Sequence, residues 1–157
     1  MRIWALAVAL ILAAGSASAQ SVEGYGALAL GAIVGGDSPR LRTGQKAVLA
    51  QLFEANTASS AHARKLDVAV DTIRCRAGNV DITAFACDLT FGARTIHLAG
   101  RRAHELFATL AEMGVAPDGA AGTIYRGIYK VRCTIDPRGV AQKDGGGATC
   151  AYAPNPP

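Results

Sequence analysis

The sequence lacks most of the short motifs that reveal an enzyme. It has no G-x-S-x-G, the motif that exposes a nucleophilic serine in one large class of hydrolases. It has no C-x-x-C pair, which argues against a redox-active thiol pair and against a zinc site. No internal repeat is visible, which argues against a solenoid or propeller. We therefore expect no cofactor and no metal, and the sequence points away from an enzyme without excluding one.

Aromatic residues are also scarce, at 6% of the chain. Proteins that bind single-stranded nucleic acid usually interleave basic side chains with aromatic ones, on which the bases stack. The basic residues of this chain are not interleaved in that way, so we expect no nucleic-acid partner. The formal net charge of +4 is a modest excess, which fits a solvated surface or an anionic partner.

No apolar run approaches the roughly 20 residues that a membrane-spanning helix needs. The first run, Ile3–Ala14, follows Arg2 and precedes small residues that end in Ala17-Ser18-Ala19. This order of a positive charge, a short apolar segment and an A-x-A site is typical of a secretory signal peptide. We therefore predict a signal peptide at residues 1–19, cleaved after Ala19. The mature protein is expected in the periplasm or outside the cell, without a stable membrane anchor.

Four cysteines are present, and all of them follow the predicted signal peptide. An even number of cysteines in an exported chain indicates disulfide bonds. Among the three possible pairings we favour Cys75–Cys87 and Cys133–Cys150, because each of these pairs brackets a predicted turn, at residues 77–79 and 136–139 respectively. Each bond would close a short loop and contribute about 3 kcal/mol by restricting the unfolded chain.

The N-terminal part of the mature chain shows little periodicity. Residues 20–40 are rich in Gly and Ala, and we expect a flexible arm there. A single domain is predicted over residues 41–153, with a Pro-rich tail at 154–157. The first helix of this domain is expected over residues 44–55, with Thr43 as its N-terminal cap.

An alternation of apolar and polar residues then predicts three strands connected as a meander. The expected strands are 66–76, 80–91 and 94–98. The alternation changes phase at Asp71 and Thr72, which indicates a bulge in the first strand. Gly92 and Ala93 fit a two-residue hairpin turn with glycine in the first position.

The clearest helix is predicted over residues 101–113, with apolar side chains repeating at helical spacing. Gly114 is placed to end it in the left-handed conformation, and Val115 to make the usual apolar contact. Residues 118–135 fit either a helix or a strand, and we combine the two as a short helix to about Tyr129 followed by a strand to Ile135.

A final short strand is expected around residues 149–152, after a Gly-rich loop. Together these elements predict a small α+β domain held by disulfide bonds. Its antiparallel sheet would combine the three-strand meander with a C-terminal hairpin, and two to three helices would cover one face.

Two histidines near the start of the clearest helix are the best catalytic candidates. His97 lies at the end of the third predicted strand, and His104 lies in the helix beside Arg101 and Glu105. Two imidazoles with an arginine and a carboxylate suit acid–base hydrolysis of a phosphodiester. The alternative is that both histidines are ordinary surface or boundary residues.

Basic residues supply the other candidate surface. Arg74 and Arg76 share one face of a predicted strand, and Lys130 and Arg132 are expected to share a face of another. We expect a non-catalytic binding or inhibitor-like module, whose partner is a protein or an anionic component of the cell envelope. The alternatives are a nuclease-like secreted hydrolase that uses His97, His104 and Glu105, and a structural protein of the envelope.

Overall fold

The computed structural model of the protein describes residues 19–54, 64–77, 81–115, 124–142 and 146–153. The predicted signal peptide and the Pro-rich tail lie outside these residues. The elements in chain order are β1 (Gln20–Glu23), α1 (Tyr25–Asp37), α2 (Thr43–Phe53), β2 (Leu66–Ala77), β3 (Ala86–Phe91), β4 (Arg94–Ala99), α3 (Arg101–Glu112), β5 (Ile124–Ile135), α4 (Pro137–Gln142) and β6 (Ala148–Ala153).

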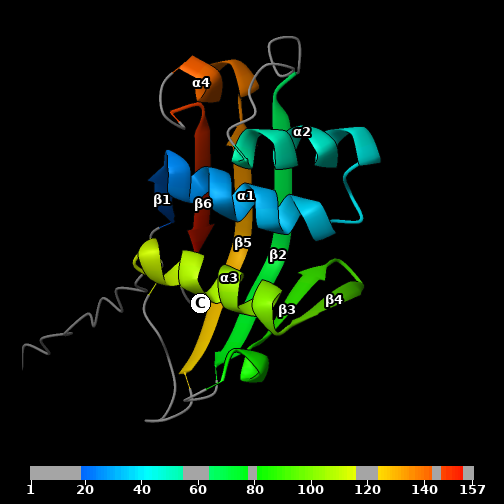
Figure 1. Cartoon of the computed structure of the whole chain (residues 1–157), viewed down its shortest axis with the longest axis vertical. Helices are drawn as coiled ribbons and strands as arrows, with labels where there is room; N and C mark the ends of the chain where they lie inside the picture. The colour runs from blue at the N-terminus through cyan, green and yellow to red at the C-terminus, as the bar shows by residue number, and fades with distance from the viewer. Residues whose placement is uncertain (1–18, 55–63, 78–80, 116–123, 143–145, 154–157) are drawn as a thin grey trace, which may run out of the picture.

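The strands form one antiparallel sheet in the order β1-β6-β5-β2-β3-β4. Helices α1, α2 and α3 lie across the same face of this sheet, and α4 lies at the end where β5 connects to β6 (Figure 1). The predicted α+β class, with an antiparallel sheet and helices on one face, is confirmed. Within the described residues, no helix is both long and apolar enough to cross a bilayer.

Two long central strands join the predicted meander to the predicted hairpin. β2 pairs with β3 on one side and with β5 on the other. Its pairing with β5 runs from Leu66 opposite Ile135 to Ala77 opposite Ile124. The β3–β4 turn is the predicted one, because Phe91 pairs with Arg94 and Gly92 has a φ of +63°. Residues 124–129 therefore belong to a strand, and the helix that we expected to reach Tyr129 is not present there.

The predicted change in the alternation of buried and exposed residues along β2 is confirmed, and the same change occurs in β5. Val70 and Ile73 are both buried, as are Val131 and Ile128 opposite them. The pairing register of β2 with β5 is the same on both sides of this point, so the side chains of both strands change faces at the same place. The bulge expected in β2 is therefore not seen between these two strands, and the register shifts instead between β5 and β6, at Tyr129 and Arg132. Lys130 takes a positive φ of 51° at this point in β5. The sequence showed the irregularity in one strand only.

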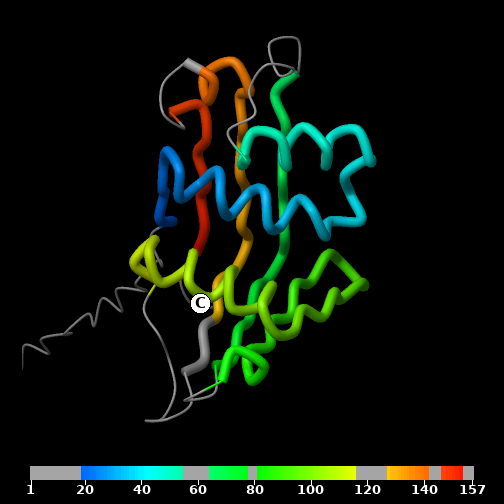
Figure 2. The backbone as a smooth tube through the Cα atoms, viewed as in Figure 1, coloured from blue at the N-terminus to red at the C-terminus, as the bar shows by residue number. Residues whose placement is uncertain are grey.

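The flexible arm expected at residues 20–40 is not found. β1 pairs with β6, so the two ends of the described chain lie side by side (Figure 2). The residues of α1 that are buried are Ala27, Leu28, Leu30, Gly31, Val34 and Gly35. A methyl group added at Gly31 would lie 2.6 Å from Cδ1 of Ile135, so the missing side chain lets this helix approach the sheet closely. The pattern was hard to recognise because α1 has almost no polar stripe opposite its buried face.

Other element boundaries differ by smaller amounts. Thr43 is the first residue of α2 rather than its cap, and the side chain of Gln45 accepts the backbone N–H of Arg42. The second predicted strand starts later than expected, because Ile82–Ala84 forms a 3-10 turn. The turn expected at residues 136–139 is instead the start of α4, where Asp136 accepts the backbone N–H of the second helical residue.

α3 ends as the sequence predicts. Gly114 has a φ of +78°, and the backbone N–H groups of Gly114 and Val115 donate to Ala111 and Leu110. This pair of hydrogen bonds defines a Schellman motif, which satisfies carbonyls that the helix itself leaves unpaired. The side chain of Val115 enters the core, where it is 3% exposed.

Both predicted disulfide bonds are present. Cys75 lies directly opposite Cys87 in the β2–β3 pair, and Cys133 lies opposite Cys150 in the β5–β6 pair. All four cysteines are buried on the face that the helices cover. The bonds therefore cross-link neighbouring strands inside the core and leave the other face of the sheet to polar side chains.

Candidate functional site on the helix-free face of the sheet

One face of the sheet is covered by none of the helices that the structure describes, and we call it the helix-free face. It carries a row of charged side chains. Arg74 in β2 is paired with Asp88 in β3, and Asp88 is paired with His97 in β4. All three side chains are exposed, because they alternate with core residues that point toward the helices. The sheet register thus brings together a guanidinium group, a carboxylate and an imidazole from three strands.

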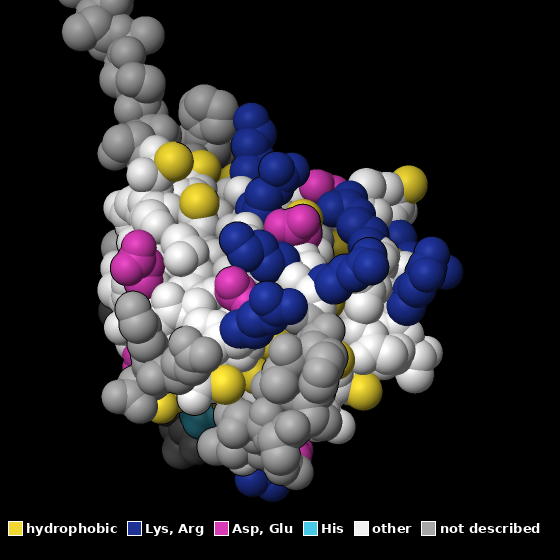
Figure 3. All heavy atoms as spheres, turned by 90° about the horizontal axis from the view of Figure 1, so that it is seen from above, with side chains coloured by type: hydrophobic (Ala, Val, Ile, Leu, Met, Phe, Trp, Pro, Cys, Tyr) yellow, Lys and Arg dark blue, Asp and Glu magenta, His cyan; other side chains and the backbone are white. Residues whose placement is uncertain are grey.

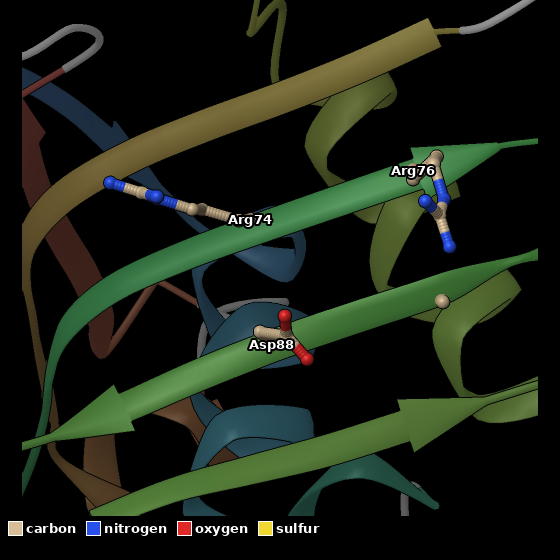
Figure 4. A pocket seen from close by; sticks show the side chains of 4 residues that line it. Arg74, Arg76 and Asp88 are labelled. Atoms are coloured by element: carbon tan, nitrogen blue, oxygen red, sulfur yellow. The ribbon is translucent and has the colours of Figure 1, made fainter.

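A shallow hollow of about 280 Å³ lies beside this row. Arg74, Arg76, Ala86 and Asp88 line it (Figure 4). Its shape follows from the next row of the register, in which Arg76 is paired with Ala86 and Ala86 with Ala99. Because alanine side chains are short, this row leaves an open space in front of the Arg76 guanidinium group.

The two arginines extend in different directions. In Figure 4 the side chain of Arg76 leans toward β3, and that of Arg74 extends toward β5. Arg74 donates a hydrogen bond to the hydroxyl of Tyr129 over 3.3 Å, and its guanidinium carbon lies 5.9 Å from the centre of the Tyr129 ring. This contact orients Arg74 from the side of β5.

Asp88 forms the opposite wall and holds the histidine. Its Oδ1 lies 2.6 Å from Nδ1 of His97, and the two side chains are 54% and 77% exposed. An ionised carboxylate only accepts hydrogen bonds, so Nδ1 carries the shared proton and the ring orientation is set by Asp88. The pair can accept and donate hydrogen bonds at the rim of the hollow.

More basic side chains lie at the end of the sheet near α4. A second hollow of about 220 Å³ is lined by Arg64, Lys65, Asp136 and Arg138. Arg132 is exposed on β5. Seen from above, Lys and Arg side chains gather over one part of the surface, with a few carboxylates between them (Figure 3). This view looks onto the end of the sheet where α4 lies and β2 begins at Leu66, whereas Arg74 and Arg76 lie near the other end of β2, which ends at Ala77.

Lys130 and Arg132 are both exposed on β5, and Val131 between them is buried. Lys130 lies at the point where the alternation in β5 changes, with a φ of 51°. Asp71, at the matching point of β2, pairs with Arg40 over 3.1 Å and accepts the backbone N–H of Gly92. The hydrogen bond from Gly92, and then the charge of Arg40, lower the pKa of Asp71 below its ordinary 3.8.

The catalytic candidates are divided between the two faces of the sheet. His97 is exposed on the helix-free face, while the ring of His104 on α3 packs edge-on against Phe85, 4.7 Å between ring centres. Arg101 and Glu105 form an exposed ion pair of 3.5 Å along α3. The sheet therefore separates the two imidazoles, and the four residues do not share a cleft.

Sequence reasoning did not find the partners of His97. In the sequence Asp88 alternates with the apolar Cys87 and Leu89, but only the strand register shows that it lies beside Arg74 and His97. The importance of Ala86 had no signal in the sequence, because its effect comes from being small between larger neighbours. Among the described residues, no cluster of three or more His, Cys, Asp or Glu side chains is placed to hold a metal ion.

Comparison with known proteins gives no match to a family model, to a curated protein or to a solved structure. A functional assignment therefore depends on the chemistry of the helix-free face.

Proposed function

We propose that this protein is exported to the periplasm or the cell exterior, where it binds an anionic component of the cell envelope without catalysis. The export part is supported by two buried disulfide bonds, which are typical of proteins from oxidising compartments. The predicted cleavage site after Ala19 lies directly before β1, which begins at Gln20 and pairs with β6, so cleavage there would leave this strand intact.

The observation that carries the binding proposal is the hollow beside Arg74 and Arg76 on the face that no helix covers. Guanidinium groups bind phosphate and carboxylate through paired hydrogen bonds, and they keep their charge at any physiological pH. The basic groups near α4 form a second cluster at the other end of β2. Two separate basic clusters suit a ligand with several anionic groups, such as a phosphate-bearing lipid or glycan.

The test compares the oxidised mature protein with a variant carrying Arg74→Gln and Arg76→Gln. Binding is measured to lipopolysaccharide dispersions, and phosphatidylcholine vesicles serve as the neutral surface. A matched control carries Arg94→Gln and Arg101→Gln, which remove the same charge from exposed positions outside the hollow.

We expect the first variant to bind lipopolysaccharide about tenfold more weakly, which corresponds to about 1.4 kcal/mol. The control should lose less than half of that free energy, and added salt should weaken binding of the unmodified protein. Equal losses in the two variants would contradict a specific role for the hollow. Association that is insensitive to salt would instead favour the structural envelope protein.

A hydrolase is the second candidate, because the Asp88–His97 contact is a geometry that orients a catalytic base. It would use His97 together with Arg74, since His104 and Glu105 lie on the other side of the sheet. Cleavage of a phosphodiester substrate by the purified protein, abolished by His97→Gln, would favour this candidate. We expect no such cleavage, because Arg74 extends toward β5 and contacts Tyr129, so its guanidinium group does not meet the imidazole of His97 on β4.

A further inference from the structure

We infer that the hollow between β2 and β3 recognises a single anionic sugar unit, one that carries a phosphate or carboxylate group next to free hydroxyls. This inference depends on the proposed binding of an anionic envelope component and names the chemistry that the hollow selects. It rests on the two different walls of the hollow, one cationic and one acidic, which a simple anion site would not combine.

Arg76 supplies the anion-binding wall. Its side chain leans over the alanine row toward β3, and within the described part of the chain it forms no ion pair. An anion seated above Ala86 would meet the guanidinium group without displacing a carboxylate from it. Arg74, oriented by Tyr129, lies at the edge of the same space.

Asp88 supplies the wall that selects against a bare anion. Its carboxylate repels phosphate, but it accepts hydrogen bonds from hydroxyl groups at the lone pairs that His97 does not use. A ligand that has only an anionic group satisfies Arg76 and leaves this repulsion uncompensated. A sugar with an anionic group and a neighbouring hydroxyl satisfies both walls at once.

The size of the hollow limits the ligand to one unit. At about 280 Å³ it lies just below the usual range of small-molecule sites, about 300–1,000 Å³. The neighbouring row carries longer side chains, those of Arg74 and Asp88, so the ligand lies over Ala86.

The test is a calorimetric titration of the mature oxidised protein with four probes, namely glucose 6-phosphate, glucuronate, inorganic phosphate and glucose. We expect glucose 6-phosphate or glucuronate to bind at least fivefold more tightly than inorganic phosphate and glucose. Which of the two binds better identifies the anionic group as phosphate or carboxylate. Either result supports the inference.

Two substitutions have opposite expected effects. Arg76→Gln should weaken every anionic probe, whereas Asp88→Ala should weaken the sugar anion and strengthen inorganic phosphate, which removes the preference. Asp67→Ala is the matched control, because Asp67 is exposed on β2, on the same face as Arg76 but outside the hollow. Ala86→Ile fills the hollow without changing charge and should weaken binding of the sugar anion at least fivefold.

The outcomes separate the inference from the proposed function. If inorganic phosphate binds as tightly as glucose 6-phosphate, or if Asp88→Ala leaves the preference unchanged, the inference is wrong while anion binding stands. If neither these probes nor lipopolysaccharide bind, both the inference and the proposed function are wrong.

Discussion

Removing one disulfide bond tests how strongly covalent cross-links stabilise this fold. The bond between Cys75 and Cys87 joins residues 12 apart, and the bond between Cys133 and Cys150 joins residues 17 apart. The chain-entropy relation gives about 3 kcal/mol for loops of either length, with a difference of only about 0.3 kcal/mol between them. Replacement of both cysteines of one pair by alanine should therefore cost a similar amount at either site.

Removing both bonds should lower the free energy of unfolding by about 6 kcal/mol, which equals or exceeds the lower end of the stability of ordinary domains, about 5 kcal/mol. Alanine is the right replacement, because a buried serine hydroxyl would add a desolvation penalty at positions that are at most 1% exposed.

Urea unfolding of the two single-pair variants and the double variant, followed by circular dichroism, measures these differences. A loss below about 1 kcal/mol for either pair would refute the argument, as would a double variant that folds normally at 37 °C.

Two further predictions concern stability. Gly147→Ala should destabilise the protein by at least about 2 kcal/mol, because the added methyl group collides with the backbone at the start of α4. Gly44→Ala places its methyl group in open space on α2 and should stabilise the protein by up to about 1 kcal/mol. Thermal unfolding of the two variants measures both effects. Asp71→Ala should cost about 1 kcal/mol at pH 7. The pKa of Asp71 in the folded protein lies below 3.8, so its contribution to the free energy of unfolding is present above that pH. This contribution is lost as the pH falls through the lowered pKa, and the unfolding free energies of the variant and the unmodified protein should therefore converge in acid. A difference that persists unchanged at pH 2 would contradict this account.

The sequence carried enough information for elements with strong local signals. The end of α3 follows from the local chemistry of Gly114 and Val115, and the β3–β4 turn from Gly92. The cysteine pairs were predictable because each closes a short loop across one predicted turn. In each of these places a few neighbouring residues decide the conformation, so no knowledge of distant contacts was needed.

Tertiary contacts decided the elements that were missed. α1 consists mainly of Gly and Ala together with aliphatic residues, and it is stable because its small residues pack against side chains such as those of Ile135 and Leu49. The first half of β5 is a strand because β2 pairs with it along its length, which overrides a sequence that also fits a helix. Both depend on partners far away in the chain.

In the candidate site, too, some features follow from local sequence and others depend on tertiary contacts. Alternation was sufficient to place Arg74 and Arg76 on one strand face, but the meeting of Asp88 with His97 depends on the register of two hairpins. The separation of His97 from His104 depends on which face of the sheet α3 covers. Sequence alone gives the residues on each strand and helix, and packing decides which of them act together.

The central claim is that the helix-free face of the sheet binds an anionic ligand at the hollow of Arg74 and Arg76. The most direct test is a nuclear magnetic resonance titration of the ¹⁵N-labelled mature protein with glucose 6-phosphate. The account predicts that the largest amide shift changes fall on residues 74–76 and 86–88. Changes confined to α1, α2 and α3, or no changes at millimolar ligand, would contradict it.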